Sequence, residues 1–281
     1  MEKIINVAIV AHVDAGKSTL VDALLSQCGA LKTSEMNVHQ IMDSNELEKE
    51  RGITIYSKNC SIRYKDYKIN IVDTPGHADF SSEVERIIKT VDTVVLIVDS
   101  KEGPMPQTRF VLDKALKQNL NPILFINKID KKDARIDEVV NMTFDLFCEL
   151  GANEKQLDFP ICYGSARDGI AKYEVEDDND NIIPLLDTII SHTKPYEGDE
   201  ADPVRMQISS LAYDDYLGRL GIGRVTKGVL KTGTMVAISK NNGEVVNSRV
   251  GKIFVNEGIK RKEVKEARYG EIAIVQTISD I

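Results

Sequence analysis

Cysteine is scarce in this sequence, and what there is does not cluster. The four cysteines are widely scattered, with no pair at the spacing of a metal-binding or redox motif. Such scatter is typical of buried, reduced thiols in a cytoplasmic protein, and it argues against a disulfide scaffold. The residues concerned are Cys28, Cys60, Cys148 and Cys162.

Long apolar runs and internal repeats are also missing. No apolar stretch approaches the roughly 20 residues that a membrane-spanning helix needs, so we expect no membrane partner. The short apolar start of the chain turns polar at His12, which is too early for a secretory signal. These absences favour a chain that stays in the cytoplasm.

The composition that remains is that of an ordinary globular protein, with 42% hydrophobic and 28% charged residues. At 281 residues the chain is long enough for two domains, since about 100–200 residues is a common domain size. Residues 1–200 hold 23 Lys and Arg against 35 Asp and Glu, whereas residues 201–281 hold 13 against 9. The resulting charges of -12 and +4 indicate two modules, and the overall charge of -8 argues against direct DNA binding.

Short apolar runs alternate with helical patterns over the first two hundred residues, which is typical of a parallel sheet wound with helices. Val94–Asp99 and Pro122–Asn127 are almost continuously apolar, as strands covered on both faces are. The patterns predict further strands at Ile4–Val10, Asn59–Tyr64, Tyr67–Asp73 and Pro160–Tyr163, and helices at Lys17–Gln27, Gln107–Gln118, Ile136–Leu150 and Pro184–His192.

The character of the sequence changes near Pro195, where a polar segment rich in Pro and Gly begins. Short alternating runs follow, separated by Gly and Asn, and these predict an antiparallel barrel or sandwich. We therefore expect a first domain over residues 1–195, a linker over 196–203 and a β-barrel domain over 204–281. Asn242-Gly243 predicts a hairpin turn. The predicted barrel strands are Val204–Ser210, Gly221–Val225, Met235–Ile238, Val245–Phe254 and Glu271–Ile278.

A phosphate-binding loop is predicted where the first strand meets the first helix. Ala-His-Val-Asp-Ala-Gly-Lys-Ser matches the pattern G-x-x-x-x-G-K-[ST], except that Ala11 replaces the first glycine. Gly16 lets the backbone approach the phosphates, and the N–H groups at the helix start form an anion cradle. Lys17 can place its charge between the β- and γ-phosphates, and the Ser18 hydroxyl can ligate Mg²⁺. The nucleotide-binding residues expected here are Asp14, Ala15, Gly16, Lys17, Ser18 and Thr19.

Asp73-Thr-Pro-Gly-His77 follows a predicted strand and falls at its carboxyl end. Ligands bind at that edge of such sheets, so Asp73 can hold Mg²⁺ through water. Gly76 can offer its N–H to the γ-phosphate, although Pro75-Gly76 alone would indicate only a β-turn. Thr54, in Arg51-Gly-Ile-Thr-Ile55, could reach the same metal ion. From spacing alone, Thr54 is better explained as a β-branched residue at the start of the next strand.

Asn127-Lys-Ile-Asp130 ends a predicted strand and indicates a guanine site. Guanine presents two adjacent N–H donors that one ionised carboxylate accepts together, so Asp130 would select guanine over adenine. Asn127 would brace the loop, and the Lys128 stem can cover the face of the base. Alone, Asn-Lys-x-Asp is often a surface turn, but here it follows two phosphate motifs. Ser165-Ala166, after the last short strand, supports Asp130 by position.

Taken in order, these segments resemble the translational GTPases, the family of elongation factors G and Tu and their relatives. Residues 11–18, 50–55 and 73–77 have the forms that this family uses. Four longer strings look like the TypA/BipA subfamily, and the resemblance covers essentially the whole chain. These strings are Glu102–Val111, Gln156–Pro160, Met206–Leu211 and Gly218–Arg224.

This resemblance implies a protein that binds GTP or GDP and hydrolyses GTP with Mg²⁺ on the ribosome, in ribosome assembly or stress-responsive translation. It implies that Thr54 ligates Mg²⁺, that His77 orients the attacking water and that Asp14 binds a monovalent cation. The expected catalytic residues are therefore His77, Lys17 and Thr54, and the expected metal ligands are Ser18, Thr54 and, through water, Asp73. No arginine finger is evident, so intrinsic hydrolysis should be slow.

The resemblance also implies an α/β P-loop GTPase domain followed by an antiparallel β-barrel domain and then by ribosome-contacting domains. The chain stops at Ile281, where the resemblance expects a closing strand, so we expect a fragment whose barrel is open along one edge, which favours association. We nevertheless expect the chain to be a monomer. The alternatives are a module that holds GTP or GDP without useful turnover and a ribosomal protection or translocation factor. A P-loop kinase or ATPase is disfavoured by Asp130.

Overall fold

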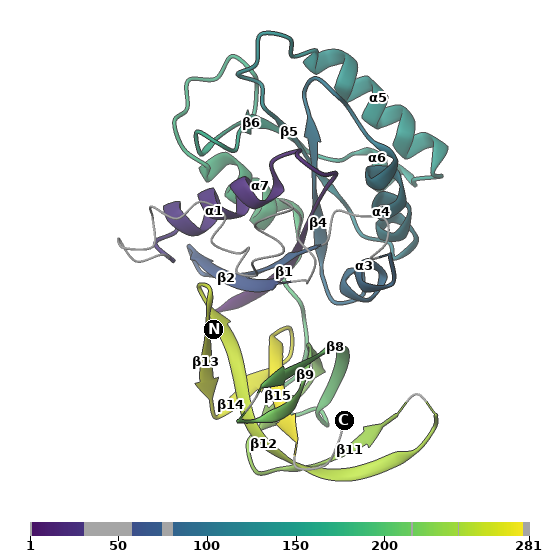
Figure 1. Cartoon of the computed structure of the whole chain (residues 1–281), viewed down its shortest axis with the longest axis vertical. Helices are drawn as coiled ribbons and strands as arrows, with labels where there is room; N and C mark the ends of the chain where they lie inside the picture. The colour runs from purple at the N-terminus through teal and green to yellow at the C-terminus, as the bar shows by residue number, and fades with distance from the viewer. Residues whose placement is uncertain (1, 31–57, 75–80, 215, 241, 278–281) are drawn as a thin grey trace.

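The computed structural model describes residues 2–30, 58–74, 81–214, 216–240 and 242–277. An α/β domain forms the upper part of the molecule in Figure 1, and antiparallel β-strands form the lower part. The predicted fold class, an α/β P-loop domain followed by antiparallel β structure, is confirmed.

A seven-stranded sheet in the order β2-β3-β1-β4-β5-β6-β7 forms the centre of the α/β domain. β1 pairs in parallel with β3 and β4, and the parallel pairing continues through β5 to β6. β2 and β7 add antiparallel edges. The strands are β1 (Lys3–Ala11), β2 (Lys58–Tyr64), β3 (Tyr67–Asp73), β4 (Thr93–Asp99), β5 (Ile123–Asn127), β6 (Ile161–Ser165) and β7 (Ile170–Lys172).

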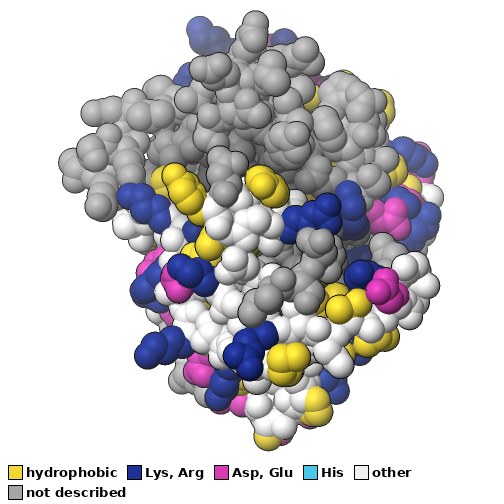
Figure 2. Space-filling view, turned by 60° about the horizontal axis from the view of Figure 1, so that its bottom comes forward, with side chains coloured by type: hydrophobic (Ala, Val, Ile, Leu, Met, Phe, Trp, Pro, Cys, Tyr) yellow, Lys and Arg dark blue, Asp and Glu magenta, His cyan; other side chains and the backbone are white. Residues whose placement is uncertain are grey.

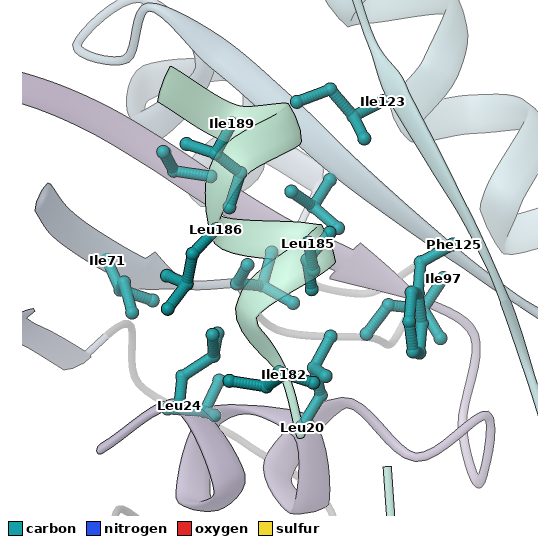
Figure 3. Close-up of a cluster of buried hydrophobic side chains, with 14 of the residues drawn as sticks. Leu20, Leu24, Ile71, Ile97, Ile123, Phe125, Ile182, Leu185, Leu186 and Ile189 are labelled. Atoms are coloured by element: carbon teal, nitrogen blue, oxygen red, sulfur yellow. The ribbon is translucent and has the colours of Figure 1, made fainter. Parts of the chain in front are cut away.

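Helices cover both faces of this sheet, because alternate residues of its inner strands point to opposite sides. Ile9 of β1 belongs to the apolar cluster on one face, and Val10 belongs to the cluster on the other. Figure 3 shows Leu185, Leu186 and Ile189 of α7 packed between the sheet and α1. The helices are α1 (Lys17–Gln27), α3 (Ser81–Ile88), α4 (Pro106–Lys117), α5 (Ile136–Glu149), α6 (Glu154–Leu157) and α7 (Ile183–His192).

The β domain is built on antiparallel strands in the order β11-β12-β15-β9-β8, with β13 beside β12 and a small β10-β14 pair. Its core is small and aliphatic, centred on Val225, Leu230, Val250 and Ile253. Figure 2 looks onto this end of the molecule and shows Lys and Arg side chains spread among separate hydrophobic spots. The strands are β8 (Arg205–Asp214), β9 (Gly218–Lys227), β10 (Val229–Lys231), β11 (Met235–Ser239), β12 (Val245–Glu257), β13 (Lys260–Val264), β14 (Glu266–Arg268) and β15 (Ile272–Thr277).

Every strand and helix predicted from the patterns has a counterpart within a few residues, and the turn at Asn242-Gly243 joins β11 to β12. The sequence did not predict α3, α6, β7, β10, β13 or β14.

The prediction of buried thiols holds for Cys60 and Cys162. It is wrong for Cys148, which is exposed on α5, and Cys28 is half-buried. Among the described helices, none combines the length and the apolar character that crossing a membrane requires.

A buried polar network joins the two domains around Asn6 of β1. Its backbone N–H donates to Asp92 Oδ2 at 2.8 Å, and its side-chain amide donates to the backbone oxygen of Gly270 at 2.8 Å. Asp92 in turn pairs with Arg224 of β9, 2.5 Å away, and both side chains are almost fully buried. Burial raises the pKa of Asp92, while the Arg224 guanidinium opposes that rise. The interface therefore depends on the pairing of buried charges.

A second buried pair lies beside the first. Lys68 Nζ of β3 contacts Glu271 Oε2 at 2.8 Å, and Asn70 donates to Glu271 Oε1 at 3.1 Å. The turn between β12 and β13 also lies against β2, where the backbone N–H of Ser61 donates to the oxygen of Gly258 at 3.0 Å. The β domain is thus fixed to β1, β2 and β3 of the α/β domain.

Candidate functional site

Several chain segments meet at the carboxyl edge of the parallel sheet. β1, β5 and β6 run in the same direction, so the loops that follow them lie on one side of the sheet. These loops hold residues 12–16, 127–130 and 165–168, the three segments that the sequence predicts to bind nucleotide. The structure therefore brings residues 12–16 beside two segments that follow more than a hundred residues further along the chain.

The loop after β1 has the backbone of an anion cradle. Asp14 and Gly16 both have positive φ, 61° and 99°, and α1 begins at Lys17. A β-carbon at Gly16 would lie 2.3 Å from Asn127 Nδ2, so only glycine fits there. Among the described residues, no side chain caps the N-terminus of α1. The backbone N–H groups of its first turn can therefore bind an anion.

Lys17 and Thr74 connect this loop to the end of β3. Lys17 is 9% exposed, and its ammonium donates to the backbone oxygen of Thr74. The Thr74 hydroxyl donates to the oxygen of Ile9 at 2.8 Å, and the register of β1 with β3 places the backbone of Asp73 opposite Ile9. The end of β3 therefore lies beside the start of the phosphate loop. Three of the predicted site residues, Thr54, Gly76 and His77, lie outside the described residues.

Asn127 ties the three loops to one another. Its side-chain Nδ2 donates to the oxygen of Ala15 at 2.7 Å, and its Oδ1 accepts from the N–H of Ala166 at 2.9 Å. Asn127 is 1% exposed, so these contacts are shielded from water. Asn127 thus contacts the loop after β1 and the loop after β6 at once.

Asp130 and Lys128 lie in the loop after β5, where Asp130 contacts the loop after β6. Asp130 Oδ2 accepts from the Arg167 guanidinium at 3.2 Å, and both groups are open to solvent. The Ser165 hydroxyl donates to Asp168 Oδ2 at 2.6 Å, which lowers the pKa of Asp168 and shapes the same loop. The Asp130 carboxylate is therefore paired in an exposed contact, of the kind that contributes little free energy.

The sequence alone assigns no role to Arg167, to Asp99 or to the pair of His12 with Glu102. Arg167 directly follows Ser165-Ala166, so its position was the only available signal. His12 Nε2 lies 2.8 Å from Glu102 Oε2, which links the phosphate loop to the turn after β4. Asp99, at the end of β4, is 1% exposed. Each of these contacts joins residues that are far apart in the sequence.

The donor set suits a hard divalent cation. Hydroxyl and carboxylate oxygens are the ligands that Mg²⁺ prefers. Ser18 lies half-exposed in the first turn of α1, and the end of β3 brings the backbone of Asp73 to the neighbouring strand. Among the described side chains, no three His, Cys, Asp or Glu cluster as a protein-only metal centre.

A parallel sheet with a glycine turn before α1, an Asn-Lys-Ile-Asp loop after β5 and a Ser-Ala loop after β6 has the architecture of a P-loop GTPase domain. Residues 2–195 match the family described as the elongation factor Tu GTP binding domain. The chain belongs to this family.

Two bacterial relatives are similar over nearly the whole chain. Both are named "Large ribosomal subunit assembly factor BipA". The Bacillus subtilis protein is 52% identical over 98% of this chain, which spans 45% of that protein. An Escherichia coli protein is 48% identical over 100% of this chain, which spans 46% of it. The chain thus spans about half the length of these relatives, and the predicted TypA/BipA resemblance is confirmed.

Solved structures support the fold. A bacterial selenocysteine-specific elongation factor, EF-Sec, aligns with 99% of this chain and 42% of its own, with a TM-score of 0.72 and 24% identity. The elongation factor SelB from Methanococcus maripaludis, solved with the GTP analogue GPPNHP, aligns with 98% of this chain and 51% of its own. Its TM-score is 0.71 and its identity 22%, so both structures show the fold alone.

Proposed function

We propose that this chain binds GTP and GDP and hydrolyses GTP to GDP and phosphate, as the nucleotide-handling part of a ribosome-associated translational GTPase. The observation that carries the proposal is the contact of Asn127 with both Ala15 and Ala166, in a member of a GTP-binding family. It joins a phosphate loop and a guanine loop into one site. A P-loop ATPase would not need the Asp130 carboxylate, because adenine lacks the two adjacent donors that it would accept.

The described residues divide the work of binding. The N–H groups at the start of α1 receive the phosphates, and Lys17 exchanges its contact with the Thr74 oxygen for phosphate oxygens. Asp130 exchanges Arg167 for the two donors of guanine, while the Lys128 stem covers the base. The further nucleotide contacts proposed are Asp14, Gly16, Ser18, Thr19, Asp73, Gly76 and Ser165, and a monovalent cation would lie beside Asp14.

The proposed metal is Mg²⁺, held by Ser18, by Thr54 and, through water, by Asp73. When bound, it neutralises charge that develops on the transferred phosphoryl group. Lys17 adds a second positive charge there, and His77 orients the attacking water. The assignments of Thr54 and His77 rest on the family resemblance, and that of Gly76 rests on the Asp-Thr-Pro-Gly motif. The position of the end of β3 beside the phosphate loop supports those of Gly76 and His77.

The proposed partner is the ribosome, bound through a longer protein that acts in the cytoplasm. The names of the relatives support a role in assembly of the large ribosomal subunit. We also propose that the chain is a monomer divided into a GTP-binding domain at 1–195, a linker at 196–203 and a β-barrel at 204–281. The family match over residues 2–195 and the antiparallel strands from Arg205 support this division.

His77→Ala separates turnover from binding. We expect GTP affinity to stay near that of the wild type, because His77 orients water and does not grip the nucleotide. Ribosome-stimulated phosphate release by the longer protein should fall by roughly 100-fold, the usual effect of losing one positioning group. Steady-state phosphate release with and without ribosomes measures this.

Lys17→Ala serves as the contrasting control in the same assay, since it should lose nucleotide affinity itself. Equal ribosome-stimulated rates in wild type and His77→Ala would remove His77 from the mechanism. Failure of the wild type to bind GTP would contradict the proposed function as a whole.

A further inference from the structure

Asp99 is a buried acid that the proposed function leaves unused. It ends β4 and is 1% exposed. Its Oδ1 accepts from the backbone N–H groups of Lys101 at 2.8 Å and Glu102 at 3.3 Å. Its Oδ2 lies 2.6 Å from Lys128 Nζ and 3.7 Å from Lys131 Nζ. A buried carboxylate needs such partners, because burial of an unpaired charge is costly.

Lys128 continues the connection from Asp99 to the phosphate loop. Its Nζ also donates to the backbone oxygen of Asp14 at 2.5 Å. One ammonium group thus spans the gap between the end of β4 and Asp14, which precedes Gly16 in the phosphate loop. Lys128 itself has a positive φ of 65°, so its backbone is held in a conformation that its neighbours must maintain.

The same turn makes further contacts with both loops. The N–H of Ser100 donates to the oxygen of Asn127 at 2.9 Å, and its hydroxyl donates to the oxygen of Lys128 at 2.8 Å. Glu102 contacts His12 of the phosphate loop. We call residues 99–102 the β4 bracket. It touches the guanine loop and the phosphate loop at once.

The charge of Asp99 is kept by its surroundings. Burial raises the pKa of Asp99, but the Lys128 ammonium and the N–H groups of Lys101 and Glu102 outweigh that rise and lower the pKa to about 2. The carboxylate is therefore ionised across the physiological range. This fixed negative charge lies 2.6 Å from the Lys128 ammonium and attracts it.

We propose that Asp99 is a positioning residue for nucleotide binding, which acts by holding the Lys128 ammonium against the Asp14 oxygen and so ties the guanine loop to the phosphate loop. This inference rests on the proposed function, since it assigns a role within the same site. Asp99 does not touch the nucleotide. It slows nucleotide release by keeping both loops in their binding arrangement.

Asp99→Asn tests this proposal with little change in shape. The asparagine oxygen can still accept from Lys101 and Glu102, but the charge that holds Lys128 is gone. We expect GDP to dissociate roughly tenfold faster, with the association rate near that of the wild type. Stopped-flow release of a fluorescent GDP analogue measures both rates. Asp133→Asn, which breaks an exposed pair with Lys101, is the matched control and should leave release unchanged.

A double-mutant cycle with Lys128→Met separates positioning from stability. If Asp99 acts through Lys128, Lys128→Met alone should accelerate GDP release, and adding Asp99→Asn should accelerate it no further. Full additivity of the two changes would overturn the proposal, as would a lower melting temperature for Asp99→Asn with wild-type release. If Asp99→Asn does not fold, unchanged GDP release from Lys128→Met would also overturn it. A wild-type chain that binds no guanine nucleotide would instead refute the proposed function.

Discussion

Asp130→Asn should convert the nucleotide preference of this chain from guanine to xanthine. The carboxylate is proposed to accept two N–H donors of guanine, and an amide can accept only one of them. Hydrogen bonds to a charged group contribute about 1.5–3 kcal/mol each, so GTP affinity should fall by roughly 100-fold or more. Xanthosine triphosphate should bind better than GTP, because the amide N–H₂ can donate to the extra carbonyl of xanthine.

Arg167→Ala is the control for this result. Asp130→Asn also weakens the contact with Arg167, an exposed pair at 3.2 Å that should add little to affinity. Arg167→Ala should therefore keep GTP affinity at or slightly above that of the wild type. Competition binding with GTP and xanthosine triphosphate measures both variants. Unchanged GTP affinity in Asp130→Asn would mean that the base lies elsewhere.

Arg224→Ala should be the most destabilising single change at the domain interface. Arg224 donates to Asp92 and to the oxygen of Thr90, and its guanidinium lies 3.9 Å from the centre of the Tyr196 ring. Removing one partner of a buried ion pair leaves the other charge buried, at a cost of about 3–5 kcal/mol. Urea unfolding should show this loss, and Arg219→Ala, an exposed change on the same strand, should not.

The effect of Arg224→Ala should depend on pH. The pKa of Asp92 is already raised by burial, and loss of the arginine removes an interaction that lowers it. The buried carboxylate is penalised only while ionised, so the destabilisation is full above the Asp92 pKa and shrinks as pH falls through it. Unfolding in mildly acidic buffer should therefore show a smaller difference from wild type than at neutral pH. A difference that does not vary with pH would assign the loss to packing against Tyr196.

The sequence predicted the parts of the fold whose patterns are local. β4 and β5 are continuous apolar runs, and the turn into α1 needs a glycine at position 16. β13 could not be recognised because Lys-Arg-Lys-Glu-Val has no apolar alternation, and it forms by pairing with the longer β12. β10 and β14 are each three residues long and form only by pairing with each other.

For the site too, the sequence predicted the residues that belong to local motifs and missed those that depend on contacts between strands. Gly16, Lys17, Asn127 and Asp130 belong to motifs of fixed spacing, so their types and positions indicate their chemistry. Asp99 and Arg167 gain their roles only when β4, β5 and β6 align side by side. No local pattern records that Asp99 faces a lysine 29 residues further along the chain. Contacts across strands are a property of the sheet, and spacing along one strand does not reveal them.

The central claim is that this chain holds guanine nucleotides selectively at the junction of the three loops. Competition against a fluorescent GDP analogue, in buffer with Mg²⁺, tests it most directly. We expect unlabelled GTP and GDP to displace the analogue at near-stoichiometric concentrations. ATP at roughly 100-fold excess should not displace it, because adenine lacks the donor pair that Asp130 is proposed to accept. Equal displacement by ATP and GTP would contradict the claim.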